Sequence, residues 1–208
     1  MGATAAESVG RQGGWTCLSL LVFALSAPAA GADTVDLARL VASWPTSFEV
    51  RGTKTEPTWV ESVRFVRQGD LFVLEGGGLP EGEQIVEAVR VTADGKIIRV
   101  ACPQHMDCGD TRPMTGFLAL AELVAAQRRG AAPGAAAAAT YAGRRLACLP
   151  AERLGVADPV IDPCFDLATG AVLAQRTRTD FTFSGPTLDA ASIRFVDPPA
   201  PVGPFPPT

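Results

Sequence analysis

The chain has 208 residues, of which 18 are Lys or Arg and 22 are Asp or Glu, so its formal net charge is −4. This length corresponds to one domain and is sufficient to bury a sizeable core. Only two lysines occur, Lys54 and Lys96, and no basic patch is formed. Nucleic-acid binding requires clustered cations that neutralise phosphates, so the composition argues against a nucleic-acid partner.

The first 32 residues have the pattern of a secretory signal peptide. One arginine precedes an apolar run from Trp15 to Ala27, and the small residues SAPAAGA follow. The run has 13 residues, whereas a membrane-spanning helix needs about 20. We expect cleavage near Ala32, with Ala30 as the alternative. The alternative interpretation of the run is a buried amphipathic helix of the folded protein.

The signal peptide predicts a secreted or periplasmic protein that starts near Asp33. Cys17 lies within the apolar run instead of just after it, so the lipid-anchor pattern of bacterial lipoproteins is missing. We expect no lipid anchor and no transmembrane segment in the mature chain. The predicted organisation is a signal peptide (1–32), a single domain (33–197) and a Pro-rich tail (198–208).

The first half of the mature chain predicts one helix followed by strands. Apolar residues at near-helical spacing predict a short amphipathic helix over Asp33–Trp44, which ends before a proline. Alternation predicts a strand with one wet face around Phe48. Two hairpins are then expected, over 59–77 and 86–102, with turns at Gly69-Asp70 and Asp94-Gly95.

The clearest helix is predicted from about Gly116 to Arg129, where Gly130 ends it. Four apolar side chains share one face of this helix: Phe117, Leu120, Leu123 and Val124. These side chains are expected to belong to the hydrophobic core in any case. They are also the candidates for lining an apolar cavity, because pockets are commonly built where a helix covers a sheet.

The second half predicts further antiparallel strands. The low-complexity segment 131–139, AAPGAAAAA, is expected to be a mobile connection, although its alanines favour helix locally. A strand is expected within 140–150 and a hairpin over Cys164–Thr177 with its turn at Thr169-Gly170. Final strands are predicted within 180–185 and 191–197, before a tail too rich in proline to enter a sheet.

Four cysteines remain after cleavage, and an even number in an exported chain indicates disulfides. Three pairings are open, and we favour Cys102–Cys108 and Cys148–Cys164 because each pair flanks a turn-rich segment. The rival interpretation is a metal site at Cys102, His105 and Cys108, whose side chains are soft or borderline ligands. We prefer the disulfide because no second Cys/His cluster supplies further ligands and because the expected compartment is oxidising.

Three segments and the C-terminus together resemble the LolA/LolB superfamily, including its LppX/LprG-type lipoproteins. They are TADGKIIRVAC with Cys108 after it, TYAGRRLACLPAERLG, and CFDLATGAVL, followed by a final strand and a DPP…PFPP ending. The resemblance implies an α+β, mainly β fold: a curved, half-closed antiparallel sheet whose concave face is covered by one long and one short N-terminal helix. Characterised members of the superfamily carry acyl chains of lipids or lipoproteins. The lipobox cysteine of the LppX/LprG branch is missing here, so membrane tethering is not implied. No residues match a lipoprotein-carrier site, so the resemblance does not imply a cargo.

Catalytic motifs are missing from the sequence. His105 is the single histidine and lies within the predicted disulfide loop, and no G-x-S-x-G occurs. The glycine-rich GGGLPEG lacks the spacing of a phosphate-binding loop. Glu81, Glu83 and Glu87, like Asp158, Asp162 and Asp166, are interpreted as solvated loop charges. We therefore expect no enzyme activity, no cofactor and no metal.

The predicted function is the binding of a lipid or acyl chain in a cavity between sheet and helix. The alternative is an envelope sensor or scaffold with a filled core, which binds a protein partner through the Pro-rich tail, since a polyproline conformation is already extended.

Overall fold

The computed structural model describes residues 33–55, 58, 60–77, 84–102, 116–131, 134–154, 161–177, 182–183, 187–203 and 205. All of them belong to one unit, Ala32–Thr208. The predicted signal peptide and Cys108 lie outside the described residues. Within the described part, no helix has the length and apolar character needed to cross a bilayer.

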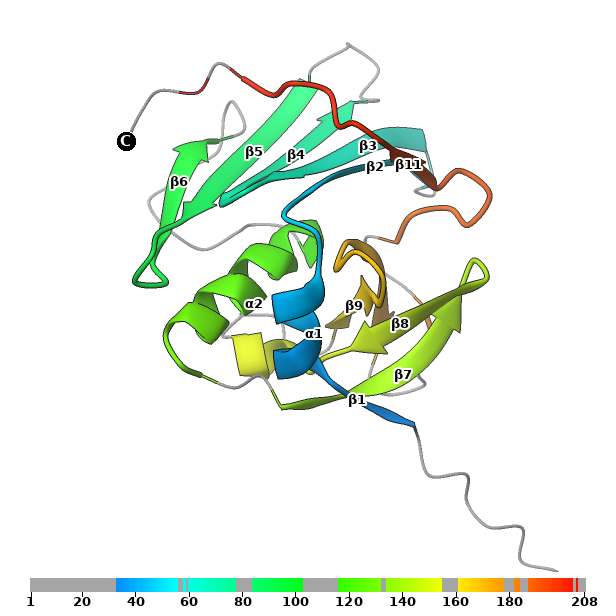
Figure 1. Cartoon of the computed structure of the whole chain (residues 1–208). Helices are drawn as coiled ribbons and strands as arrows, with labels where there is room; N and C mark the ends of the chain where they lie inside the picture. Colours follow the sequence, from blue (N-terminus) through cyan, green and yellow to red (C-terminus); the bar gives the residue numbers. More distant parts are fainter. Residues whose placement is uncertain are drawn as a thin grey trace, which may run out of the picture. The chain divides into compact units, whose positions relative to one another are not determined.

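The larger sheet has six antiparallel strands in the order β11-β2-β3-β4-β5-β6 (Figure 1). Its strands are β2 (Ser47–Thr55), β3 (Val60–Gln68), β4 (Leu71–Gly77), β5 (Gln84–Val91), β6 (Ile97–Ala101) and β11 (Arg194–Val196). The predicted turns at Gly69-Asp70 and Asp94-Gly95 join β3 to β4 and β5 to β6, so both hairpins are confirmed. The last strand, β11, pairs with β2, the first strand of this sheet in the sequence.

The smaller sheet has five strands in the order β1-β7-β8-β9-β10. They are β1 (Thr34–Asp36), β7 (Ala135–Tyr141), β8 (Arg144–Cys148), β9 (Ile161–Asp166) and β10 (Val172–Thr177). The hairpin expected over Cys164–Thr177 is confirmed as β9 and β10, and Gly170 in its turn has a φ of 77°. Phe183, in the segment predicted as a strand, makes an isolated bridge with Arg176.

The fold class is confirmed: the protein is mainly β, its sheets are antiparallel, and they do not close into a barrel. Hairpin signals in the sequence show which neighbouring segments pair. They do not show where one sheet ends and the next begins. The structure has two sheets, whereas the sequence predicts a single sheet.

The short N-terminal helix is confirmed, but its start differs from the prediction, and the prediction for the alanine-rich segment is wrong. The first helix, α1 (Leu37–Ser43), begins four residues later than expected, because Asp36 caps it and the preceding residues form β1 against β7. The alanine-rich segment is not a connection over its whole length. Ala135–Tyr141 forms β7, which pairs with β1 on one side and β8 on the other. Backbone hydrogen bonds to two neighbours thus outweigh the weak strand preference of alanine.

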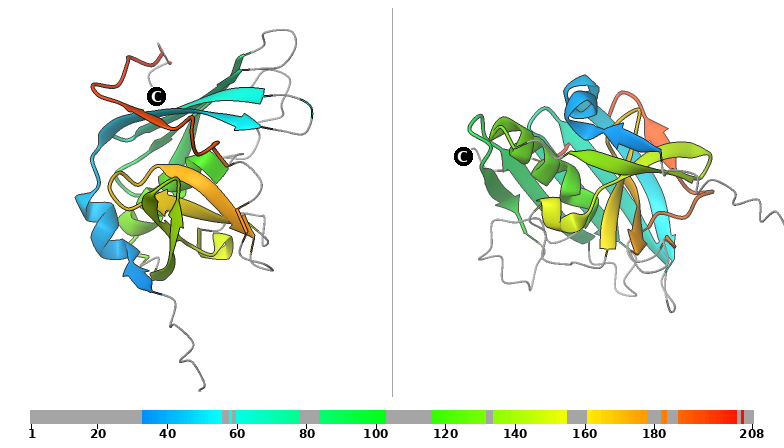
Figure 2. Two further views of the ribbon diagram at one scale, coloured as in Figure 1. Left: turned by 90° about the vertical axis from the view of Figure 1, so that its right-hand side faces the viewer. Right: turned by 90° about the horizontal axis from the view of Figure 1, so that it is seen from below.

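The long helix is confirmed as one helical segment made of the 3₁₀ helix η1 (Gly116–Leu118) and the α-helix α2 (Ala119–Arg128). It lies on the face of the six-stranded sheet that is turned toward the five-stranded sheet (Figure 2). The η1 turn contacts β4 of one sheet and β10 of the other, and α2 contacts β5 and β6, the helix α1 and the short 3₁₀ helix η2 (Ala151–Leu154). One core of buried side chains joins the helices to both sheets.

Candidate functional site

The helical segment Gly116–Arg128 is the centre of the candidate apolar site. The structure brings the four predicted side chains together, and all four are buried in the main core: Phe117, Leu120, Leu123 and Val124. Their neighbours in that core come from both sheets, and they include Phe65, Phe72 and Leu74 from the larger sheet and Leu146, Phe165 and Leu173 from the smaller one. The four side chains predicted from the sequence therefore lie between apolar residues of the larger sheet and apolar residues of the smaller sheet.

The burial of α2 extends around its whole circumference. Eight consecutive residues, Ala119–Ala126, are buried, including the carboxylate-bearing Glu122. The sequence shows only one apolar face, because the other face is built from alanines, which occur equally well on exposed helix surfaces. A surface helix normally keeps a polar face in water, so a helix covered on all sides is a central element of the core.

Gly116 and Gln175 meet where the helical segment begins against β10. A β-carbon on Gly116 would lie 1.4 Å from Nε2 of Gln175, so only glycine leaves room for this amide. Gln175 is 5% exposed, and its Nε2 atom is buried without a hydrogen-bond partner among the described residues. Neither residue was among those predicted from the sequence. A glutamine that directly follows the apolar residues Val172, Leu173 and Ala174 in the same strand is the one signal that could have indicated this position.

A disulfide joins Cys148 to Cys164, as predicted. The two residues face each other in register on β8 and β9, with their α-carbons 4.0 Å apart. The bond therefore ties two paired strands together within the main core. Cys102 is also disulfide-bonded, while its predicted partner Cys108 is outside the described residues. Disulfides of this kind are consistent with an oxidising compartment.

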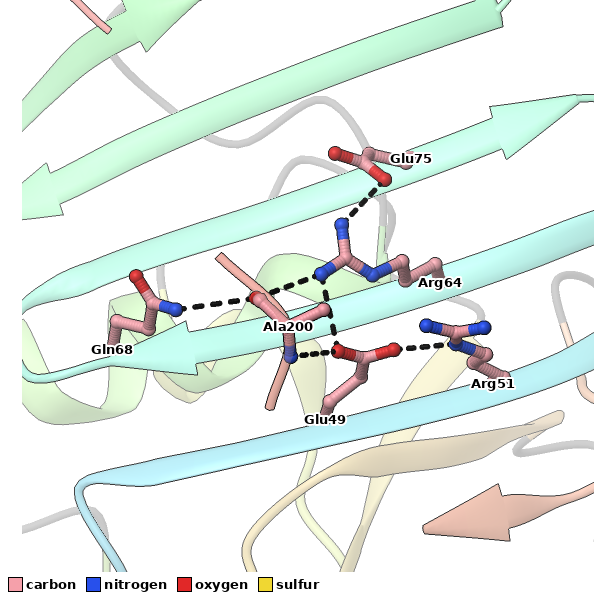
Figure 3. A network of polar contacts seen from close by, with 6 residues as sticks. All are labelled: Glu49, Arg51, Arg64, Gln68, Glu75 and Ala200. Atoms are coloured by element: carbon pink, nitrogen blue, oxygen red, sulfur yellow. Dashed lines mark hydrogen bonds and ion pairs between the residues drawn. The ribbon is translucent and has the colours of Figure 1, made fainter. Parts of the chain in front are cut away.

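A network of charged side chains lies on the other face of the six-stranded sheet. Along β2, Phe48 and Val50 point into the core, so the alternation of the strand directs Glu49 to the opposite face. Glu49 is nevertheless fully buried there. Its carboxylate accepts hydrogen bonds from Arg51, from Arg64 at 3.1 Å and from the backbone N–H of Ala200 at 2.8 Å (Figure 3).

The network holds the start of the C-terminal tail. Arg64 donates to the carbonyl of Ala200 at 2.9 Å and to Glu75 at 2.8 Å, and Gln68 donates to the same carbonyl at 3.3 Å. Burial alone raises the pKa of Glu49, but the hydrogen bonds from Arg64, Arg51 and Ala200 lower it to about 2. The Glu49 carboxylate is therefore charged at neutral pH. The backbone N–H and the backbone carbonyl of Ala200 are both hydrogen-bonded.

Beyond Ala200 the tail supplies apolar cover to this outer face. Val202 and Phe205 pack against a second cluster of buried residues, Val66, Val73 and Ala88. The tail thus covers part of the face that the sequence predicts to be wet, whereas Arg51 on the same face stays exposed (Figure 1). The described residues of the proline-rich segment do not enter the sheet, and three of them, Ala200, Val202 and Phe205, contact the domain.

The described residues assemble no group of three or more His, Cys, Asp or Glu side chains that could bind a metal ion. His105, the candidate ligand between two cysteines, lies outside the described residues, and so do the acidic residues Glu81, Glu83 and Asp158.

Three other acidic side chains that were predicted to be solvated are buried: Glu87, Asp162 and Asp166. Asp166 accepts hydrogen bonds from Arg144 at 2.7 and 2.9 Å, and Asp162 accepts one from the N–H of Ala151 at 3.2 Å. Glu87 forms an ion pair with Arg99. These three carboxylates are therefore structural groups, and their interpretation as solvated loop charges is wrong.

Comparisons with protein-family models, with curated proteins and with solved structures find no match to this chain. The resemblance to the LolA/LolB superfamily stays a prediction that rests on the sequence motifs.

Proposed function

We propose that this protein is a non-catalytic binding protein of an oxidising, extracytoplasmic compartment, and that it takes up an apolar ligand such as the acyl chain of a lipid. The ligand lies between the helical segment Gly116–Arg128 and the walls formed by the two sheets. The observation that supports this proposal most is the burial of that segment on all sides between two separate sheets.

The strands and the helical segment are held in place by different kinds of interaction. Strands within each sheet are fixed by directional backbone hydrogen bonds. The side chains around Leu120 are held by apolar contacts, which are non-directional and roughly proportional to buried area. An acyl chain that enters beside the helix replaces such contacts with equivalent ones. Each methylene that it buries contributes about 0.8 kcal/mol, so binding needs no catalytic residue.

Two further observations support the proposal. The disulfides of Cys102 and of Cys148 with Cys164 are typical of exported proteins. The motifs that resemble the LolA/LolB superfamily, taken in their order along the sequence, include the hairpin that carries Cys164. Characterised members of that superfamily carry acyl chains.

The test is native mass spectrometry of the purified protein before and after extraction with organic solvent. We expect lipid to be retained, and we expect Leu120→Trp to lower its yield because the indole occupies the space beside the helix. Val60→Trp is the matched control, since Val60 is 54% exposed on β3. Lipid-free protein that does not take up added fatty acid would refute the proposal.

The alternative function, a module that binds a protein partner through its tail, draws less support. Ala200, Val202 and Phe205 are engaged with the outer face of the six-stranded sheet, so a partner would have to displace them. No described contact favours such a displacement.

A further inference from the structure

The side-chain amide of Gln175 stands out among the buried polar groups of the core. Its Nε2 atom is buried and has no hydrogen-bond partner among the described residues. The backbone of the same residue is well held, because its N–H donates to Oγ1 of Thr187 at 3.0 Å. A buried donor without an acceptor is rare in folded proteins and costs stability, so it points to an acceptor that comes from outside the chain.

The amide is aimed at the beginning of a helix. It lies against Gly116, the first residue of the helical segment, where a β-carbon would be 1.4 Å from Nε2. The first N–H groups of a helix lack intrahelical acceptors and carry a partial positive charge. No acidic residue occurs in the η1 turn, and Leu118 gives α2 no side-chain cap. The amide donor of Gln175 and the first N–H groups of the helical segment therefore lie close together.

The surroundings of this point are apolar. Phe117 and Leu118 on one side and Leu173 and Ala174 on the other belong to the main core. A ligand that fits here carries one oxygen acceptor at the end of an apolar chain. A strongly hydrated or highly charged group would lose its water without compensation.

We propose that Gln175 and the start of η1 form the head-group subsite for an acyl chain, and that they bind the carbonyl oxygen of a lipid ester or of a fatty acid in its neutral, protonated form. This inference rests on the proposed function and adds to it the chemistry that the site recognises. Gly116 is the companion residue, because its missing side chain leaves room for the amide.

The test measures the affinity of the full-length purified protein for three probes of equal chain length: a long-chain fatty acid, its methyl ester and the corresponding alkane. Gln175→Leu removes the donor and keeps the approximate volume, and Gln175→Met is a second variant in case the first is misfolded. Gln127→Leu makes the same chemical change at the far end of α2 and serves as the control.

We expect Gln175→Leu to weaken binding of the acid and the ester by about ten-fold, the size of one lost hydrogen bond, and to leave alkane binding unchanged. We also expect its melting temperature to equal or exceed that of the wild type, because an unpaired buried amide is removed. If the wild type binds all three probes and the Gln175 variants weaken none selectively, the subsite is refuted while the proposed function stands. If the wild type binds none of the three probes, both the subsite and the proposed function are refuted.

Discussion

The indole ring of Trp44 covers the α-carbon of Gly170, so closely that a β-carbon there would lie 2.5 Å from ring atom Cε3. Nε1 of Trp44 donates a hydrogen bond to the carbonyl of Leu167 at 2.9 Å, and the ring stacks on Phe165 with centroids 6.1 Å apart. The residue that ends α1 therefore holds the β9–β10 turn in place. This contact fixes one end of the hairpin that carries Cys164 and Gln175.

Replacing Gly170 with alanine should be more damaging than the same change at Gly143. Both glycines have positive φ values, 77° and 72°, so each alanine pays a conformational cost of about 1 kcal/mol. A β-carbon on Gly143 would meet no atom within 4 Å, whereas one on Gly170 would meet the ring of Trp44. Overpacking adds about 1–3 kcal/mol, so we expect Gly170→Ala to lower the free energy of unfolding by about 3 kcal/mol in urea titrations.

The comparison has an internal check. In a Trp44→Leu background the excess cost of Gly170→Ala over Gly143→Ala should shrink, because the ring that causes it is gone. Equal losses for the two alanine variants in the wild-type background would show that Trp44 does not press on Gly170.

Glu49 should make stability depend on pH in the acid range. Its pKa is lowered from 4.5 to about 2 in the folded protein. The unfolded chain therefore binds more protons than the folded one between these values, and the contribution of Glu49 is present above about pH 4.5 and lost as the pH falls toward 2. Glu49→Gln should cost about 2 kcal/mol at neutral pH, because charge-assisted hydrogen bonds become neutral ones.

Thermal unfolding of the wild type and Glu49→Gln from pH 7 to pH 2 measures this effect. The difference between the two proteins should narrow as the pH falls through the range between the two pKa values of Glu49. Because the carboxylate is buried, the difference at neutral pH should persist in about 1 M salt, which screens exposed ion pairs. A difference that stays constant with pH would contradict the assignment of Glu49 as a buried anion.

Removing the disulfide between Cys148 and Cys164 should destabilise the fold without dismantling it. The bond closes a loop with a sequence separation of 16, for which the chain-entropy model gives about 3 kcal/mol. We expect the double variant Cys148→Ala/Cys164→Ala to lose about that amount in urea titrations. Reduction of the wild type with dithiothreitol should cost more, since Cys102 is disulfide-bonded too. Free thiols at Cys148 or Cys164 in the unfolded, unreduced wild type would contradict the pairing.

The turns and the long helix were predictable because their signals are local. Asp94-Gly95 and Thr169-Gly170 carry turn chemistry between alternating segments, and Gly130 ends a helix with helical spacing of apolar residues. β7 was missed because nothing in its alanines favours a strand. Its conformation comes from β1 and β8, and β1 is about a hundred residues earlier in the chain.

The candidate site was only half accessible to prediction. The face that carries Leu120 follows from periodicity, but the second buried face of α2 and the meeting of Gly116 with Gln175 depend on β10, which the sequence does not place beside the helix. The Glu49 network could not be predicted from the sequence for a similar reason. The alternation of β2 predicts a wet face, and the peptide that covers it belongs to Ala200, 151 residues later.

That separation has a consequence for biogenesis. A nascent chain that has emerged only as far as β6 contains Glu49 but lacks Ala200 and β11, so its carboxylate and the flank of β2 still face solvent. The six-stranded sheet is completed only when β11 and Ala200 join it, so all strands of the five-stranded sheet are synthesised before the six-stranded sheet can be complete.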